Sequence, residues 1–329
     1  MEHATHLSHL IVLGSGTSEG IPRVTCLTKK SENNYCQVCH DANPFKSEKL
    51  DNNNNKRSKN FRRNTSLLLK ITNPNPHKES QQDKTHKTPF YHVLIDCGKF
   101  FYPSAMEWFP MFNITHLDSV IISHCHADAS FGIDDLRDWC LNVEHGGTVI
   151  PVYMTKEDTT IIVQHFPYFQ SSVENAKQIG GGIPALKNLE MVENKPIEIV
   201  PNYFITVFTV NHGLGNSLGF LLAGPNNEKI IWCSDVKFVP EENLHYFENL
   251  DILFLDLLFD INQKKHPSHF CYEDSIEFIR KFKPKHTYFV GMNHTVDHTL
   301  MNEKLKNEFK NEIGKMKVEL GYDGLCVEF

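Results

Sequence analysis

The sequence predicts an α/β protein built around two β-sheets, and three observations carry this prediction. Short β-branched or aromatic runs of strand length recur along the chain, helical stretches lie between them, and many of the strands end in polar residues. A chain of 329 residues, of which 40% are hydrophobic, is long enough to bury a large core. We therefore expect one large domain over residues 1–329, with insertions.

The strands are predicted from runs rich in Val, Ile, Leu, Phe and Tyr. In the first half of the chain they lie at residues 10–13, 66–71, 92–95, 119–122 and 149–153. In the second half they lie at 197–200, 204–210, 218–222, 229–233, 251–255, 286–290, 318–320 and 325–329. So many strands imply two sheets.

Helices are expected between the strands, at residues 131–141, 156–166, 241–249, 272–282 and 300–315. Two further stretches, 41–59 and 72–88, are polar and rich in Asn, Lys, Pro and His, so they cannot repay the entropy of ordering. We interpret them as mobile surface insertions in the single domain and not as linkers between domains.

The charge balance and the hydropathy pattern exclude two classes of protein. With 33 Lys and Arg against 40 Asp and Glu, the formal net charge is -7, so no global positive field gathers nucleic acid. The longest apolar stretch, residues 250–259, contains Asp251 and Asp256 and falls short of the roughly 20 apolar residues that span a bilayer. Because the N-terminus also lacks a signal-like apolar segment, we expect a cytoplasmic protein without membrane contact.

Potential ligands follow many of the predicted strands at their C-terminal ends. In open α/β sheets this edge is where ligands bind, so side chains that follow different strands can converge there. We expect one shared site at this edge, drawn from Asp96, His124, His212, Asp235, Asp256, His294 and His298.

The segment His124-Cys-His126-Ala-Asp128 comes directly after the apolar run 120–122. Two imidazoles and a carboxylate at alternate positions, where a buried strand ends, can turn onto one small volume and hold a metal ion. Zn²⁺ suits a site of three histidines, and a site that contains aspartate also accepts Mn²⁺. The sequence therefore predicts a catalytic centre with one or two Zn²⁺ or Mn²⁺ ions.

A second candidate metal site involves cysteines. Cys36-Gln-Val-Cys39 has the two-residue gap that lets both thiolates bind one tetrahedral Zn²⁺, and Cys26 plus His40 could complete a structural zinc site. The alternative is a cysteine-rich loop without metal, because only one Cys-x-x-Cys pair is present. Cys39 and His40 are adjacent, so both need not ligate.

The order of these residues resembles the metallo-β-lactamase superfamily. The matching positions are His124-x-His126-x-Asp128, His212-Gly213, Ser234-Asp235, and His294 with Asp297-His298. The opening Leu13-Gly-Ser-Gly-Thr-Ser-Glu-Gly-Ile-Pro22, the cysteines behind it and Arg62-Arg-Asn-Thr-Ser66 resemble the branch of PhnP-type cyclic phosphodiesterases and, more distantly, tRNA-end-processing endonucleases.

This resemblance implies a four-layer αββα sandwich of two mixed sheets flanked by helices. It implies that His124, His126 and His212 bind a first metal ion, that Asp235 bridges to a second ion, and that Asp128 is a ligand of that second ion. The same comparison assigns His269 to a non-ligating active-site histidine, which can donate a proton to a leaving alkoxide. The alternative for His269 is a helix cap.

The sequence departs from the family pattern at two positions. Ala129 replaces the histidine that usually follows the aspartate, and Gly291 replaces a late histidine ligand of the cyclic phosphodiesterases. Our hypothesis is a variant second site whose catalytic and ligating residues are drawn from Asp128, Asp235, His294 and His298.

These features predict a metal-dependent hydrolase, first of all a phosphodiesterase that acts on a small or cyclic phosphodiester. The alternatives are a thioester or lactone acyl hydrolase, a tRNA-end-type endonuclease, which the acidic net charge disfavours, and a metal-binding pseudoenzyme with a scaffold role. A small-molecule substrate is the expected partner, nucleic acid is not favoured, and a homodimer is left open. Ala129 supports the scaffold, but a charged cluster is costly to bury unless metal neutralises it.

Overall fold

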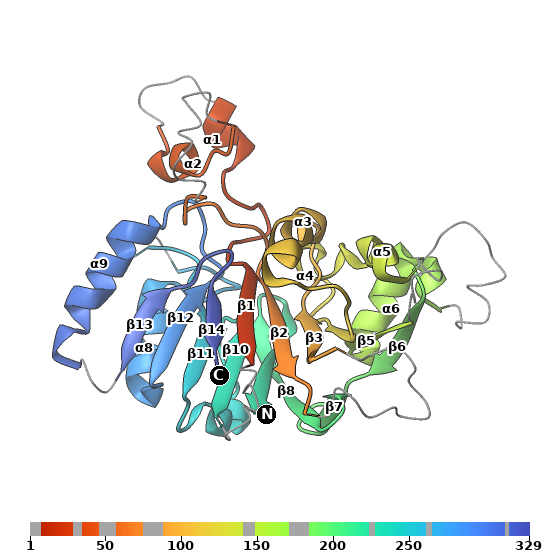
Figure 1. The fold of residues 1–329 in the computed structure, drawn as a ribbon. Helices are drawn as coiled ribbons and strands as arrows, with labels where there is room; N and C mark the ends of the chain where they lie inside the picture. Colours follow the sequence, from red (N-terminus) through yellow and green to blue (C-terminus); the bar gives the residue numbers. More distant parts are fainter. Residues whose placement is uncertain are drawn as a thin grey trace, which may run out of the picture.

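Two seven-stranded sheets form the centre of the molecule (Figure 1). The computed structural model describes residues 8–28, 35–45, 57–74, 88–140, 149–170, 184–223, 228–260, 265–312 and 316–329. Within these residues the sheets pack face to face and helices cover their outer faces. The predicted α/β sandwich of two mixed sheets flanked by helices is therefore confirmed.

The first sheet has the strand order β14-β1-β2-β3-β4-β5-β6. Pairing is antiparallel from β14 to β3 and parallel from β3 to β6. The parallel strands end at one edge, where the Asp96 backbone N–H donates to the Ile121 carbonyl over 2.8 Å. The strands are β1 (His9–Gly14), β2 (Ser66–Thr72), β3 (Phe90–Ile95), β4 (Ser119–Ile121), β5 (Ile150–Met154), β6 (Leu186–Glu190) and β14 (Cys326–Glu328).

The second sheet has the order β13-β12-β11-β10-β9-β8-β7. Here β7 to β10 pair antiparallel, whereas β10 to β13 are parallel. The residues after β10, β11 and β12 therefore leave from a common edge. The strands are β7 (Pro196–Val200), β8 (Tyr203–His212), β9 (Gly215–Ala223), β10 (Lys229–Cys233), β11 (Ile252–Asp256), β12 (His286–Val290) and β13 (Lys317–Leu320).

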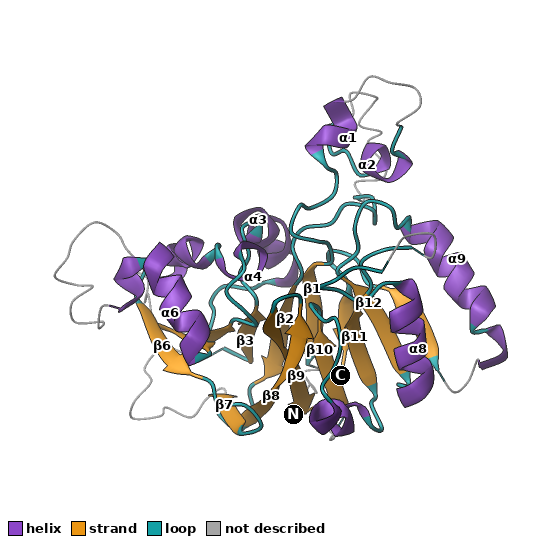
Figure 2. Ribbon diagram, turned by 180° about the vertical axis from the view of Figure 1, so that it is seen from behind, coloured by secondary structure: helices purple, strands orange, loops and turns teal. Residues whose placement is uncertain are grey.

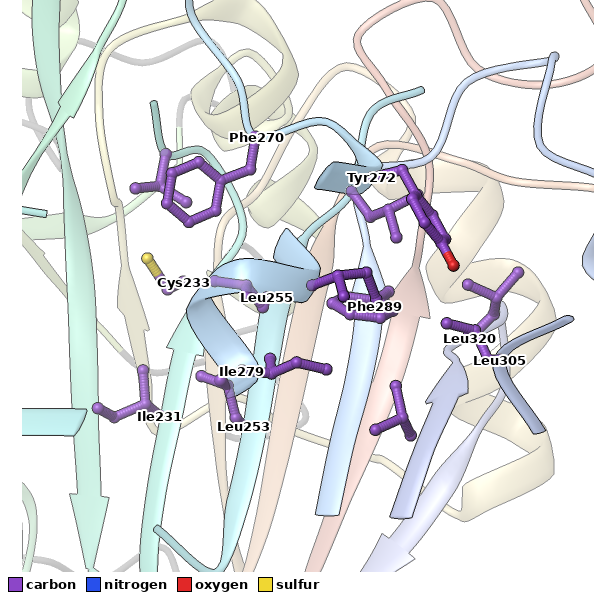
Figure 3. Close-up of a cluster of buried hydrophobic side chains, with 14 of the residues drawn as sticks. Ile231, Cys233, Leu253, Leu255, Phe270, Tyr272, Ile279, Phe289, Leu305 and Leu320 are labelled. Atoms are coloured by element: carbon purple, nitrogen blue, oxygen red, sulfur yellow. The ribbon is translucent and has the colours of Figure 1, made fainter. Parts of the chain in front are cut away.

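The core forms because successive side chains of a strand point to opposite faces. In β2, Leu67 and Leu69 pack between the two sheets, whereas Leu68 packs on the outer face. In β11, Phe254 packs between the sheets while Leu253 and Leu255 pack outward against helices, in the cluster of Figure 3. Strands that are buried on both faces read as continuous apolar runs, as these do.

Helices cover the outside of both sheets (Figure 2). α3, α4, α5 and α6 cover the first sheet, α8 and α9 cover the second, and the short α1 and α2 lie above the strand ends (Figure 1). The helices are α1 (Val24–Thr28), α2 (Gln37–Asp41), α3 (Phe101–Phe112), α4 (Ala127–Ser130), α5 (Arg137–Cys140), α6 (Lys156–His165), α8 (Tyr272–Phe282) and α9 (His298–Glu308). Short 3₁₀ turns lie at Ile133–Leu136, Pro167–Gln170, Glu241–Phe247 and Lys310–Glu312.

The structure differs from the sequence prediction at a few elements. α3 was not predicted because Pro103 and Pro110 fall within it, and proline is unfavourable in a helix interior. β6 was missed because its short run Leu-Lys-Asn-Leu-Glu is largely polar. The helices predicted at 131–141 and 241–249 are instead a 3₁₀ turn followed by α5, and a 3₁₀ turn.

Parts of both predicted insertions, residues 46–56 and 75–87, lie outside the described residues. In the part of the chain that the structure does describe, no helix has the length and apolar character needed to cross a membrane.

Candidate metal centre

Three histidines converge at the edge where the two sheets meet. His124 and His126 follow β4, and His212 is the last residue of β8. Their ring centroids lie 4.5 Å (His124 to His126), 5.1 Å (His124 to His212) and 5.2 Å (His126 to His212) apart. One nitrogen of each ring lies within 4.8 Å of the others, so three imidazoles from two strand ends surround one small volume.

Hydrogen bonds fix which nitrogen of two rings faces this volume. The Nδ1 of His124 lies 2.9 Å from the Ser123 hydroxyl, which donates to Asp96 over 2.9 Å. The Nδ1 of His212 lies 2.9 Å from the Ser268 carbonyl, which can only accept. A proton on each Nδ1 leaves both Nε2 atoms free to bind a metal ion. Asp96, which was expected at this edge, acts on His124 through Ser123.

The geometry of the triad fits a metal ion. At Zn–N bonds of about 2.0–2.1 Å, two nitrogens of a tetrahedral site lie about 3.3 Å apart. The Nε2 of His124 and the Nδ1 of His126 are 2.9 Å apart. Burial lowers the pKa of His124 to about 3, which outweighs the effect of Asp235 and keeps this ring neutral, as a ligand must be.

Asp235 adds a carboxylate to the same volume. It follows β10, is 6% exposed, and groups with His212 and His269 within 4.8 Å. Burial alone would raise its pKa, but His124, His212 and His269 outweigh burial and lower the pKa of Asp235 to about 2. The carboxylate is therefore ionised and available to a cation.

His269 is held by a second carboxylate. Its Nδ1 lies 2.7 Å from Oδ2 of Asp256, the fully buried last residue of β11. Burial lowers the pKa of His269, but Asp256 outweighs it and raises that pKa above the ordinary value. This pair therefore retains a proton at the edge of the site. The alternative of a helix cap is wrong, because the N-cap of α8 is Cys271.

Asp128 lines the same cavity from the start of α4. Burial, followed by the nearby Asp235, raises its pKa. A Cβ on Gly98 would lie 1.7 Å from the Asp128 carbonyl oxygen, so the bare backbone of Gly98 is what lets this segment approach β3. The chain continues with Ala129, which is buried.

The cavity beside these groups has a volume of about 620 Å³. Residues from the opening loop after β1 and from the segment around His294 complete its walls. Its polar lining includes Thr17, Ser18, Glu19, Arg23, Asp128, Asp235, His266, His269, Asn293 and His294.

Two residues expected in the second metal site lie elsewhere. His298 begins α9, is 7% exposed and lies against Asn302 and Tyr322. His294 lines the cavity, but its ring contacts cysteines and Arg23. Among the described residues, neither histidine groups with Asp128 or Asp235 as a possible set of metal ligands.

The cysteine cluster takes His294 as its fourth member. Cys26, Cys36, Cys39 and His294 offer atoms that all lie within 4.8 Å of one another. The Nδ1 of His294 lies 3.5 Å from Cys26 Sγ and 3.3 Å from Cys36 Sγ. In a tetrahedral zinc site with Zn–S of about 2.3 Å and Zn–N of about 2.0–2.1 Å, these separations are about 3.5 Å, so the set fits Zn²⁺.

His40, the expected fourth ligand, is not in this group. Its ring stacks on Tyr35 at a centroid distance of 4.2 Å. Sequence spacing could not identify His294, since it is 258 residues from Cys36 and only the fold joins them.

The fold and the site together define a metal-dependent hydrolase of the metallo-β-lactamase fold, a fold that implies divalent metal ions. Residues 91–292, well over half of the chain, match the β-lactamase superfamily domain, and the chain belongs to this superfamily. The resemblance found in the sequence is thereby confirmed at the level of the superfamily.

Similar proteins match nearly the whole length of the chain. It is 26% identical over 315 residues to an octanoyltransferase of Porphyromonas gingivalis, which covers 96% of this chain and 50% of that protein. The chain thus spans half the length of this relative. A diphosphatase from the PhnP family shares the fold with a TM-score of 0.70 and 24% identity over 98% of both chains. Zn²⁺-bound PqqB from Methylobacterium extorquens has a TM-score of 0.66 and 14% identity, over 98% of this chain and 100% of that one.

Proposed function

We propose that this chain is a metal-dependent phosphodiesterase that acts on a small or cyclic phosphodiester. The observation that carries the proposal is the histidine triad with Asp235 and the proton-holding pair of His269 and Asp256 beside one polar cavity. The shared fold with a diphosphatase from the PhnP family supports it.

His124, His126, His212 and Asp235 would hold one Zn²⁺ or Mn²⁺ ion. Such an ion lowers the pKa of a bound water to about 7 and offsets the charge of the attacked phosphoryl group. Ala129 and Gly291 offer no imidazole for a second ion, and His269 is engaged by Asp256. We therefore propose one ion at this centre and one at the cysteine cluster.

The other residues of the cavity handle protons and orientation. His269 donates its proton to the departing oxygen, and the buried Asp256 keeps the imidazole in place and protonated until then. Asp128, which lines the same cavity, would orient the attacking water. Asp235 would bind the ion and offset part of its positive charge.

A proton donor favours an alkoxide as the leaving group. An alkoxide leaves poorly unless it is protonated, whereas a thiolate, with an ordinary pKa near 8.5, leaves without help. This argument places the phosphodiester above a thioester. The acyl alternative keeps one supporting observation, the similarity to a protein named octanoyltransferase.

A panel of metal-loaded assays tests the proposal. Wild-type chain with Zn²⁺ or Mn²⁺ is offered a nitrophenyl phosphodiester, a phosphomonoester, a nitrophenyl thioester and a short RNA. We expect the diester to be the preferred substrate. Preference for the thioester would establish an acyl hydrolase instead. Cleavage of RNA alone would establish a nuclease, and turnover of none of the substrates would favour the scaffold role.

The role of His269 is tested by changing the leaving group. We expect His269→Ala to slow a diester with an alkyl leaving group by about 10²-fold to 10⁴-fold, and to slow a nitrophenyl diester much less. Its metal content should equal that of wild type, whereas His126→Ala loses one ion. The exposed His245 supplies the matched control, His245→Ala. Loss of metal from His269→Ala would instead make His269 a ligand.

A further inference from the structure

Two histidines and an aspartate form a further cluster of potential metal ligands in the first sheet, away from the histidine triad. His92 belongs to β3, and His116 and Asp118 lie in the segment between α3 and β4. Each residue offers one ligand atom, and these atoms all lie within 4.8 Å of one another. We propose that His92, His116 and Asp118 form a third metal site of this chain, which takes Zn²⁺.

The place of this cluster in the fold follows from the parallel pairing of β3 and β4. Asp96 and His124 follow the C-terminal ends of these two strands, at the edge that carries the triad. His116 and Asp118 instead precede β4, and His92 lies in the first half of β3. Because the two strands run in the same direction, these three residues lie towards the other edge of the sheet. The cluster is therefore separate from the proposed catalytic centre.

His92 is the most buried member of the cluster. Its side chain shares the outer face of the sheet with Leu94, because alternate residues of a strand point to the same face. The residue is 2% exposed, and neither ring nitrogen has a hydrogen-bond partner among the described residues. Buried polar groups nearly always have a partner, since burial removes their contacts with water. A metal ion would supply the partner that this imidazole lacks.

The imidazole of His92 is in the protonation state that a metal ion needs. Burial, followed by the neighbouring His116, lowers the pKa of His92 to about 3. The backbone of His116 has a small opposing effect on this pKa, but it forms no hydrogen bond of ordinary geometry with the ring. The ring is therefore neutral at pH 7, and a neutral imidazole is the form that binds metal.

His116 and Asp118 already have the separation of two zinc ligands. Nε2 of His116 lies 3.3 Å from Oδ2 of Asp118. With Zn–N and Zn–O bonds of about 2.0–2.2 Å, two ligands of a tetrahedral site lie about 3.3–3.6 Å apart. The ring centroids of His92 and His116 are 4.5 Å apart. The Thr115 hydroxyl lies 3.1 Å from Nδ1 of His116, so it can hold the proton there and leave Nε2 to the ion.

The backbone of β3 fixes the position of Asp118. Its Oδ2 accepts the His92 backbone N–H over 2.6 Å, and its own backbone N–H donates to the His92 carbonyl over 2.9 Å. The side chains of His116 and Asp118 are 15% and 9% exposed, so solvent reaches the cluster. Three protein ligands leave one position of a tetrahedral ion to water. The oxygen of the Thr88 hydroxyl, 3.4 Å from Nε2 of His116, can accept a hydrogen bond from that water.

The zinc content of the chain at micromolar free zinc, measured by native mass spectrometry, tests the proposal. We expect His116→Ala to hold one ion fewer than wild type. Asp118→Asn should show the same deficit, although its amide oxygen can still accept the His92 N–H. Combining His116→Ala with His126→Ala should remove two ions, because the two sites are separate. His245→Ala changes an exposed histidine outside the ligand groups and should keep the wild-type content.

Equal zinc content in wild type, His116→Ala and Asp118→Asn, with all three folded by circular dichroism, would overturn the site. A measurement on wild type alone covers the case in which the variants do not fold. Anomalous scattering at the zinc edge, from crystals grown at micromolar zinc, should show an ion between His92, His116 and Asp118. No peak there, or a peak that appears only at millimolar zinc and marks an adventitious ion only, would also overturn the proposal.

Discussion

Gly291 stands where the resemblance to the family implies a late histidine ligand, and a side chain at this position would be strained and would meet Asp256. Its φ of 74° is a conformation that L side chains rarely adopt. A Cβ at this position would lie 2.5 Å from Oδ1 of Asp256. Asp256 therefore occupies the space that a side chain at position 291 would need, and that same carboxyl group holds His269. The absence of an imidazole at position 291 and the hydrogen bond between Asp256 and His269 therefore belong to one arrangement.

Gly291→Ala tests this arrangement. We expect a loss of about 1–3 kcal/mol in the free energy of unfolding, because the new methyl group meets both backbone strain and the Asp256 carboxyl group. The kcat for diester hydrolysis should fall by more than the loss of folded protein explains, because His269 loses the hydrogen bond to Asp256. Urea unfolding and kcat are measured beside Gly215→Ala, where an added Cβ meets no atom within 4 Å. Equal behaviour of the two variants would contradict the argument.

The histidine triad is the part of the site that the sequence could predict. His124 and His126 are two residues apart at the end of a buried strand, so local geometry alone brings their rings together. His212 ends a run of the same kind in β8, a strand of the second sheet. The proton positions could not be predicted, because the Ser268 carbonyl that orients His212 lies 56 residues away.

At the scale of elements, the edge of the second sheet carries a partly buried ionic contact. Glu319 of β13 accepts from the ring of His286 in β12 and from the Lys317 ammonium, both at 2.7 Å. Burial alone would raise the pKa of Glu319, but these two donors outweigh burial and lower it to about 2. The contact therefore couples the last strand of the sheet to its neighbour through a charge.

This contact predicts a pH dependence of stability. Because the folded pKa of Glu319 is depressed, its carboxylate stabilises the fold above about pH 4.5, and that contribution is lost as the pH falls towards 2. Glu319→Gln should therefore be less stable than wild type at neutral pH and lose less stability on acidification. Urea unfolding at several pH values measures this difference. The carboxylate of Glu328 is exposed, so Glu328→Gln should show the same dependence of stability on pH as wild type. If Glu319→Gln also lost stability on acidification in parallel with wild type, Glu319 would not be the source of the pH dependence.

At the scale of the whole molecule, the sequence predicts the layers of the fold better than the contacts between residues that lie far apart in the chain. Apolar strand runs and their order indicate two sheets, and strand ends indicate the edge that carries the triad. The cysteine cluster shows the limit of this reasoning. The Cys-x-x-Cys spacing predicts a nearby ligand such as His40. In the structure the fourth member is His294, which follows β12 near the other end of the sequence. Only the packing of the two sheets reveals that ligand.

The contacts of His294 with Cys26 and Cys36 predict the effect of metal removal on the segment that carries α1 and α2. α1 and α2 have five residues each, too few for a stable isolated helix, and they pack around a small apolar cluster of Ile21, Val38, Cys39 and Ala42. They lie apart from the sheets above the strand ends (Figure 1). A metal ion shared by their cysteines and His294 would therefore bind this segment to the rest of the molecule.

We expect a chelator to raise amide hydrogen exchange in α1 and α2 strongly while β1, which is fully buried over Leu10 to Leu13, keeps its protection. Cys36→Ser should reproduce this change without chelator, whereas Cys326→Ser, an exposed thiol outside the cluster, should not. Unchanged exchange in α2 after complete zinc removal would show that packing alone orders this segment, and the cysteine cluster would then have no structural role.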